Sequence, residues 1–140
     1  MIDFISAVKN ILEEHNENLS DLFSVGVISK NTFYKYKKRN PSLTTLIKVA
    51  NFLKTTIDYL YELKDTNNFV EYAVKQTNFY NTLMAFIERH NISCRKFCKD
   101  LNYAKDNVLR WKTGTLPSVR TLYEISKYFG CEIDELLQKK

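Results

Sequence analysis

The chain has 140 residues, of which 44% are hydrophobic and 26% charged, with only three glycines and two prolines. This composition excludes a disordered chain and favours a folded, helical protein. The net charge of +5 is compatible with a polyanionic partner, whereas no apolar run approaches the roughly 18 residues of a membrane span. Three cysteines without disulfide-framework spacing favour a reducing compartment, so we expect a cytoplasmic protein with no membrane partner.

Residues 1–63 are predicted to form a small domain of short helices. Asn18 with Asp21 has the spacing of a capping box, which marks the start of a helix. Ser29 and Ser42 are natural N-caps for a third and a fourth helix. No strand pattern is found, so we expect an all-α domain.

Residues 64–78, KDTNNFVEYAVKQTN, connect this domain to the rest of the chain. The segment from Phe69 to Val74 is too apolar for a free tether. We therefore expect a short linker helix of about 22 Å, packed on one or both flanking domains.

Residues 79–140 are predicted to form a second small helical domain. Apolar residues recur at helical spacing from Phe79 to Ile87, and Ser93 is a natural N-cap for the next helix. Asn102 can adopt the left-handed conformation of a tight turn. About three residues separate the second and third helices, so a sharp corner is expected between them.

The remainder of this second domain is also helical in pattern. Val108 and Trp111 form the inward face of a third helix, which Gly114 ends. Ser118 is expected to cap a fourth helix and Gly130 to close it. A last turn follows, with apolar residues at Ile133, Leu136 and Leu137.

The two predicted domains carry the same pattern. At an offset of 75 residues, ILEEHN (residues 11–16) falls on FIERHN (residues 86–91). One extra residue in the later loop shifts the offset to 76, and Pro41-Ser42 then falls on Pro117-Ser118. A single loop gap aligns about 60 residues, so we interpret the chain as two copies of one domain.

The segment SCRKFCKDLNYAKDNVLRWKTG (residues 93–114) resembles the helix-turn-helix of the phage-repressor family, also called Cro-like or xenobiotic-response-element-like. PSVRTLYEISKYFGCEIDELL (residues 117–137) resembles the closing part of the same domain, and NLSDLFSVGVISKNTFYKY (residues 18–36) fits the helix-turn-helix of the first copy. The resemblance implies an all-α chain of two tandem lambda-repressor-like domains, each of five helices, at residues 1–63 and 79–140.

The resemblance also implies that the third helix of each domain, at about residues 30–38 and 105–113, lies in the major groove of double-stranded DNA. A helix fits that groove, and its first side chains can reach the base edges. Arg110 suits guanine, Asn107 suits adenine, and Asp106 suits the amino group of cytosine or orients Arg110. The side chains expected to read bases are Lys30, Asn31, Tyr34 and Lys35 in the first copy, and Lys105, Asp106, Asn107 and Arg110 in the second.

Phosphate contacts would position the protein on DNA. Helix N-termini offer free N–H groups to anions, and residues 30–39 carry five positive charges and no acid. The residues expected at phosphates are Asn18, Lys37, Lys38, Arg39 and Ser42 in the first copy, and Ser93, Lys112, Thr113, Thr115, Ser118 and Arg120 in the second.

No enzymatic chemistry is expected. The sequence shows no nucleophile–base pair, no paired carboxylates at useful spacing and no glycine-rich phosphate loop. Cys94 and Cys98, with His90 nearby, could be interpreted as a zinc site or a redox pair. Cys98, however, occupies the small buried position of the family, and no fourth ligand is evident. We therefore expect no metal and no cofactor.

Two functions from different classes remain. The first is a sequence-specific DNA-binding transcriptional regulator, by family resemblance a repressor, in which the tandem copies imitate a two-fold repressor dimer. The second is a protein-binding or inhibitor module on the same scaffold, with weak or one-domain DNA binding. A homodimer or another protein partner is compatible with either, and binding to random double-stranded DNA discriminates between them.

Overall fold

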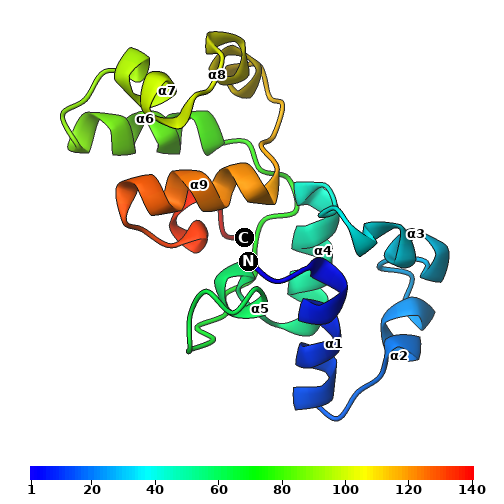
Figure 1. The fold of residues 1–140 in the computed structure, drawn as a ribbon. Helices are drawn as coiled ribbons and strands as arrows, with labels where there is room; N and C mark the ends of the chain where they lie inside the picture. Colours follow the sequence, from blue (N-terminus) through cyan, green and yellow to red (C-terminus); the bar gives the residue numbers. More distant parts are fainter. The chain divides into compact units, whose positions relative to one another are not determined.

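The computed structural model describes all 140 residues and is all-helical (Figure 1), which confirms the predicted all-α class. The chain divides into two compact units. Unit 1 comprises Met1–Val74 together with Lys139–Lys140, and unit 2 comprises Lys75–Gln138. None of the helices has the length and apolarity that crossing a bilayer requires.

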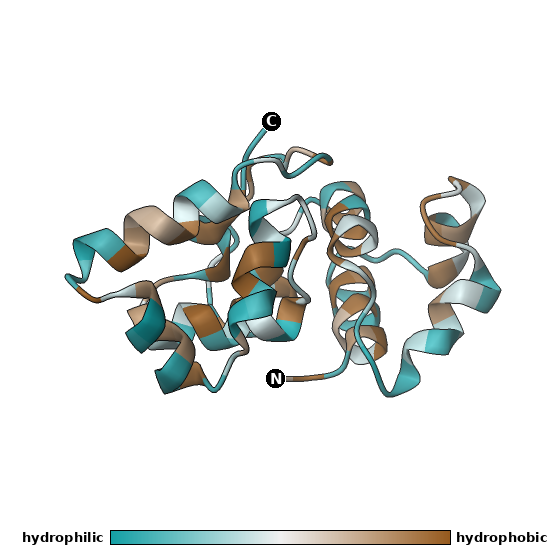
Figure 2. Ribbon diagram, turned by 90° about the horizontal axis from the view of Figure 1, so that it is seen from above, coloured by the Kyte–Doolittle hydropathy of each residue, from teal (hydrophilic) through white to brown (hydrophobic).

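Unit 1 contains five α-helices and one 3-10 segment. In chain order they are α1 (Phe4–Glu14), α2 (Leu19–Ser24), α3 (Lys30–Tyr34), η1 (Lys35–Lys37), α4 (Leu43–Leu53) and α5 (Ile57–Leu60). The core of the unit is apolar, with Phe4, Leu22, Phe33, Leu46 and Ile57 fully buried. The helices carry hydrophobic residues on one side and hydrophilic residues on the other (Figure 2), as expected for helices that bury one face.

The starts of α2, α3 and α4 in unit 1 are those that the sequence predicts. Asn18 and Asp21 form a reciprocal capping box at α2. The Ser29 hydroxyl accepts from the backbone N–H of Thr32, and Ser42 caps α4 in the same way. Each of these caps satisfies an N–H group that the helix itself leaves unpaired, which is why polar residues at these positions fix the boundaries.

The predicted recognition helix at residues 30–38 is wrong in one respect. The α-helix ends at Tyr34, and Lys35–Lys37 continue as a 3-10 turn with Tyr36 outside the helical region (φ −92, ψ 32). The rings of Phe33 and Tyr36 both pack against Phe4 on α1, each at a centroid distance of 5.7 Å. Packing of these two rings on α1 therefore accompanies the change from α-helix to 3-10 turn after Tyr34.

The predicted linker helix is also wrong, because no residue from 64 to 78 is helical. The Asn51 side chain on α4 donates to the Tyr72 carbonyl oxygen at 3.0 Å and accepts from the Tyr72 N–H at 2.9 Å. The Tyr72 hydroxyl also accepts from the Ile57 N–H at 3.0 Å. These contacts satisfy backbone groups that a helix would pair internally, and they hold a fully buried Tyr72 in unit 1.

The last two residues of the chain pair with the same extended segment. Tyr72 and Lys139 form an isolated antiparallel bridge. The Lys140 N–H donates to the Glu71 carbonyl oxygen at 2.9 Å, and the Lys140 ammonium pairs with the Glu71 carboxylate at 2.9 Å. The boundary between the units thus falls between Val74 and Lys75, inside the predicted linker, and the last two residues return to unit 1.

Unit 2 contains four α-helices and a closing 3-10 helix. They are α6 (Phe79–Arg89), α7 (Cys94–Leu101), α8 (Lys105–Lys112), α9 (Val119–Phe129) and η2 (Ile133–Leu136). The predicted last turn is therefore a 3-10 helix, which Glu132 and Glu135 begin with a reciprocal capping box. Unit 1 differs in that it has the 3-10 segment η1 between α3 and α4 and ends in the α-helix α5.

The predicted turns and caps of unit 2 are confirmed. Ser93 and Ser118 cap α7 and α9 by accepting backbone N–H groups. Asn102 has a left-handed conformation (φ 58) between α7 and α8, and Gly130 (φ 67) closes α9. Trp111 is only 8% exposed and its ring packs edge-on against Phe79 at 5.5 Å, so it is a core residue as predicted.

Candidate nucleic-acid interface

The corner between α7 and α8 positions the candidate reading surface of unit 2. The left-handed Asn102 ends α7, and the Tyr103 N–H donates to the Cys98 carbonyl oxygen at 2.8 Å, which closes the helix end. Two residues later α8 begins at Lys105. The short connection forces the two helices to meet at an angle, with α8 presented outward on a rigid support.

Two buried side chains fix the rotation of α8. Val108 and Trp111, three residues apart, are both less than 10% exposed. The opposite face carries Lys105, Asp106 and Arg110, all exposed, while Asn107 is half-buried. The sequence prediction of an inward and an outward face on this helix is therefore confirmed. That these side chains read bases stays a prediction.

Asn107 and Arg110 also line a pocket of about 180 Å³ between α8 and the start of α9. Ser118, the N-cap of α9, lies in the same lining. Arg110 is predicted to contact a base and Ser118 a phosphate, and their shared pocket was not predicted. Only the packing of α8 against the following loop brings them to one pocket, so no local pattern could have shown it.

The equivalent segment of unit 1 differs. Lys30, Asn31 and Lys35 are exposed, as expected for residues that contact a ligand. Tyr34 is half-buried, and its ring packs edge-on against Phe33 at 5.2 Å. Tyr34 also lines a groove with Phe23 of α2. Tyr34 is thus partly engaged in packing, which leaves Lys30, Asn31 and Lys35 as the more accessible polar groups.

The basic residues after these helices are accessible. Lys37, Lys38 and Arg39 are exposed, and the Arg39 guanidinium lies 5.7 Å from the centre of the Tyr36 ring. In unit 2 the exposed residues after or near the equivalent helix are Lys112, Thr113, Thr115 and Arg120. Three of these side chains have intramolecular partners. The Thr113 hydroxyl donates to the Arg110 carbonyl oxygen at 2.9 Å, Arg120 lies 3.9 Å from the Glu124 carboxylate, and the Lys112 ammonium lies 5.9 Å from the centre of the Tyr80 ring.

The four polar N-caps assigned to phosphate already serve their own helices. Asn18, Ser42, Ser93 and Ser118 each accept a backbone N–H through the side-chain oxygen. The Ser42 and Ser118 hydroxyls also donate to Thr45 and Thr121, each at 3.2 Å. A phosphate at these helix starts would therefore bind to backbone N–H groups, because the side-chain oxygens already have hydrogen-bond partners.

Tyr103 also belongs to this surface, although it is not among the predicted site residues. Its hydroxyl donates to the Glu124 carboxylate on α9 at 2.7 Å. Burial, together with this hydrogen bond and the charge of Glu124, raises the pKa of Tyr103 far above the usual tyrosine value. The bond joins the helix-turn-helix corner to α9, and its partner lies 21 residues away, beyond the reach of local sequence patterns.

The chain offers no group of three or more His, Cys, Asp or Glu residues that could hold a metal ion. His90 contacts Phe129 at a ring-centroid distance of 4.7 Å and bonds to the Phe86 carbonyl oxygen through Nδ1 at 2.9 Å. His90 is the C-cap residue of α6, and these contacts give it a structural role there.

Two helices joined at a sharp corner, with a polar face on the second, define the helix-turn-helix class. Consistent with this geometry, residues 82–139 match the family model of the Cro/C1-type HTH DNA-binding domain. A Cro/C1-type domain is therefore present in the second half of the chain, where the sequence resemblance placed one. No curated protein and no solved structure matched the chain.

Proposed function

We propose that the chain is a sequence-specific double-stranded DNA-binding transcriptional regulator that acts as a repressor. The observation that carries this proposal is the outward face of α8 in the domain that matches the Cro/C1-type family. On that face Lys105, Asp106 and Arg110 are exposed opposite a buried Val108 and Trp111. A helix held this way presents its first turns to the major groove.

Arg110 is the central reading residue in this proposal. Its guanidinium can donate two hydrogen bonds to the O6 and N7 of guanine. Asp106 lies one turn earlier on the same helix and can accept from a cytosine amino group or orient Arg110. The half-buried Asn107 suits an adenine at the rim of the contact.

Unit 1 is proposed to be a second helix-turn-helix domain. Its first four α-helices, α1 to α4, follow the order of α6 to α9 in unit 2, and Ser29 and Ser42 cap the starts of α3 and α4. Lys30, Asn31 and Lys35 take the place of the unit 2 reading residues. Because the two sets differ, the preferred half-sites are expected to differ in sequence.

Phosphate contacts are proposed to come mainly from the basic segment of unit 1, Lys37 to Arg39. All three residues of this segment are exposed, and none is acidic. Lys112 and Arg120 would act in the same way in unit 2. Such contacts are independent of sequence and sensitive to salt.

The test is a gel shift of the full chain with random double-stranded DNA at low salt, followed by selection and sequencing of bound fragments. We expect enrichment of a bipartite site with two unlike halves. Enrichment of a single short half-site would restrict sequence reading to unit 2. No shift at low salt, or a shift without sequence enrichment, would contradict a sequence-specific regulator.

A protein-binding or inhibitor module is the second candidate, and one feature of unit 1 favours it. Its α3 has only five residues and continues as a 3-10 turn, while Val25 in the preceding turn is 56% exposed. An apolar residue beside a shortened helix suits a protein surface better than a DNA groove. In that case DNA affinity would be weak or would come from unit 2 alone.

A further inference from the structure

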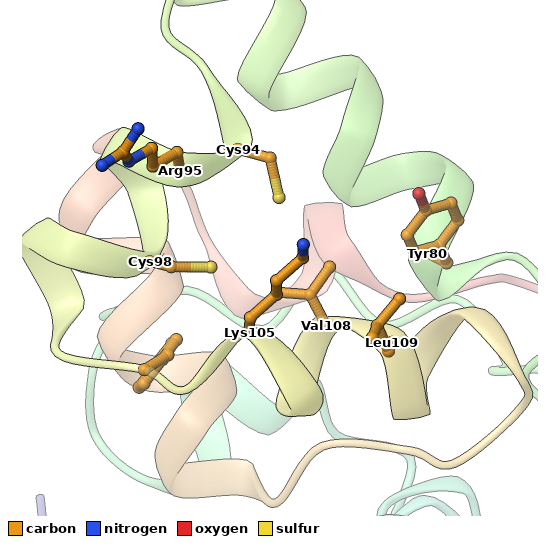
Figure 3. Close-up of a pocket in the computed structure, with 8 residues that line it drawn as sticks. Tyr80, Cys94, Arg95, Cys98, Lys105, Val108 and Leu109 are labelled. Carbon is orange, nitrogen blue, oxygen red and sulfur yellow. The ribbon is translucent and has the colours of Figure 1, made fainter.

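A groove of about 550 Å³ runs between α7 and α8 of unit 2, and of the proposed DNA-reading residues Lys105 lines it. Its lining includes two cysteines four residues apart on α7, together with the first residue of α8. Figure 3 shows the side chains of Cys94, Cys98 and Lys105 converging in this groove, with Val108, Leu109 and Tyr80 along its apolar wall.

Both thiols are half-buried and neither is in a disulfide. Residues four apart on a helix share one face, with Cβ atoms about 5–6 Å apart. A disulfide needs about 3.5–4.5 Å between Cβ atoms, so direct oxidation would have to unwind the first turn of α7. A single atom placed between the two sulfurs supplies the missing length while the helix stays intact.

Zinc does not suit this place, because structural zinc takes four ligands and no third His, Cys, Asp or Glu completes a group here. Soft monovalent ions need fewer ligands and suit sulfur. Cu⁺ prefers thiolate ligands, and both Cu⁺ and Ag⁺ form stable complexes with two sulfurs. A pair of thiols on one helix face is a complete ligand set for such an ion.

The charges around the groove also favour a monovalent cation bound by the two thiolates. Two thiolates and one monovalent cation leave a net charge of −1. The Lys105 ammonium lies at the same groove (Figure 3), and Cys94 is the first residue of α7, where the helix dipole favours negative charge.

Unit 1 has the same groove without the thiols. At the 75-residue offset, Leu19, Phe23 and Lys30 replace Cys94, Cys98 and Lys105, and they line a groove of about 590 Å³ between α2 and α3. The fold therefore accepts plain hydrocarbon at both positions. Unit 2 alone carries sulfur at both of them.

We propose that Cys94 and Cys98 form a two-coordinate site for a soft monovalent cation, Cu⁺ or its analogue Ag⁺. Binding converts two thiols and one cation into a dithiolate complex and releases two protons to solvent, and no electron is transferred. Because Lys105 is also a proposed DNA-reading residue, an ion in this groove would alter DNA binding. That coupling, unlike the ion site, rests on the proposed function.

The test uses the full chain, reduced and under anaerobic conditions, titrated with Ag⁺ and with Cu⁺ against a competing chelator. We expect one tightly bound ion per chain. Cys94→Ala and Cys98→Ala should each weaken binding at least tenfold, whereas Cys131→Ala should leave it unchanged. Three equal sites, each removed by one of the three substitutions, would mean independent thiols and overturn the proposal.

A second measurement needs no substitution and so does not depend on how the variants fold. Alkylation of the wild-type chain, mapped by mass spectrometry, should show that one equivalent of Ag⁺ protects Cys94 and Cys98 together and leaves the reactivity of Cys131 unchanged. Protection of all three cysteines alike, or of neither Cys94 nor Cys98, would overturn the two-coordinate site.

Discussion

The Tyr103 hydroxyl donates a hydrogen bond of 2.7 Å to the Glu124 carboxylate and so joins the turn before α8 to the middle of α9. The Tyr103 ring also packs edge-on against Trp111 at 6.0 Å and against Phe97 at 6.1 Å. The Tyr103 side chain thus connects the corner before α8 with α7, α8 and α9. The orientation of α8 depends on this residue as well as on its own buried face.

Replacing Tyr103 by Phe should destabilise unit 2 while keeping its fold. The ring contacts remain, but a half-buried, charge-assisted hydrogen bond is lost, at a cost of about 1–2 kcal/mol. Thermal or urea unfolding measures the change. Tyr128→Phe is the matched control, because Tyr128 donates to Asp100 at 2.6 Å at an exposed position. Equal losses in the two variants would show that the burial of Tyr103 contributes nothing.

Tyr103 should also make the stability of the folded chain depend on alkaline pH. Burial and Glu124 raise the pKa of Tyr103 in the folded chain above the usual value of 10.0. The unfolded chain then releases this proton first, so stability is intact below about pH 10 and falls as the pH rises further. Urea unfolding between about pH 8 and pH 11 should show a smaller decline in Tyr103→Phe than in the wild type. Parallel declines would contradict the assignment.

Asn51 should be essential for the extended segment of unit 1. Its amide pairs with both backbone groups of Tyr72, and Asn51→Leu leaves a part-buried N–H and carbonyl without this partner. We expect a loss of about 1–3 kcal/mol in the free energy of unfolding, together with faster hydrogen exchange at Tyr72. Asn68→Ala, at an exposed position in the same segment, serves as the control and should change neither. A neutral Asn51→Leu would mean that water replaces the amide.

The basic segment of unit 1 should control the salt dependence of DNA binding. Replacing Lys37, Lys38 and Arg39 together by Ala should flatten the slope of log affinity against log salt by up to about three units. The selected DNA sequence should stay the same, because phosphate contacts carry no base information. Lys9→Ala with Lys48→Ala, at exposed positions on α1 and α4, should leave the slope unchanged. An unaltered slope in the triple variant would place this segment away from DNA.

Arg110 should determine the preference at one or two base pairs of one half-site. Arg110→Ala keeps the fold because the side chain is exposed, and it should weaken specific binding about tenfold or more, given that a bidentate contact discriminates by about 1–3 kcal/mol. Lys127→Ala, exposed on α9, is the control. Selection of binding sites with each variant measures the effect.

The matched change in unit 1 is Lys35→Ala, with Tyr34→Ala as a second variant for a register shifted by one residue. Each should alter the other half-site only. If the Arg110 variant and both unit 1 variants select the wild-type sequence with undiminished affinity, the third helices do not read DNA. The protein-binding function would then be the better account.

The sequence by itself determined the helical class, the helix starts and the inward faces. Capping is a local interaction: Ser93 reaches an N–H three residues away, so the residue types at these positions suffice to place the boundary. The inward faces follow from helical periodicity, which is why Val108 and Trp111 could be assigned to the core. The Cro/C1-type resemblance of the second half rests on the same short-range spacing.

The tertiary structure alone decided what depends on distant partners. Residues 64–78 have the apolar content of a packed helix, but Asn51, 21 residues before Tyr72, supplies its backbone hydrogen bonds and makes an extended segment possible. In unit 1 the α-helix ends at Tyr34 and a 3-10 turn follows, in which Tyr36 packs on Phe4. In unit 2 the Tyr103 hydroxyl is bonded to Glu124. Likewise, the face shared by Cys94 and Cys98 follows from helical spacing, whereas the meeting of both thiols with Lys105 in one groove depends on the packing of α8 against α7.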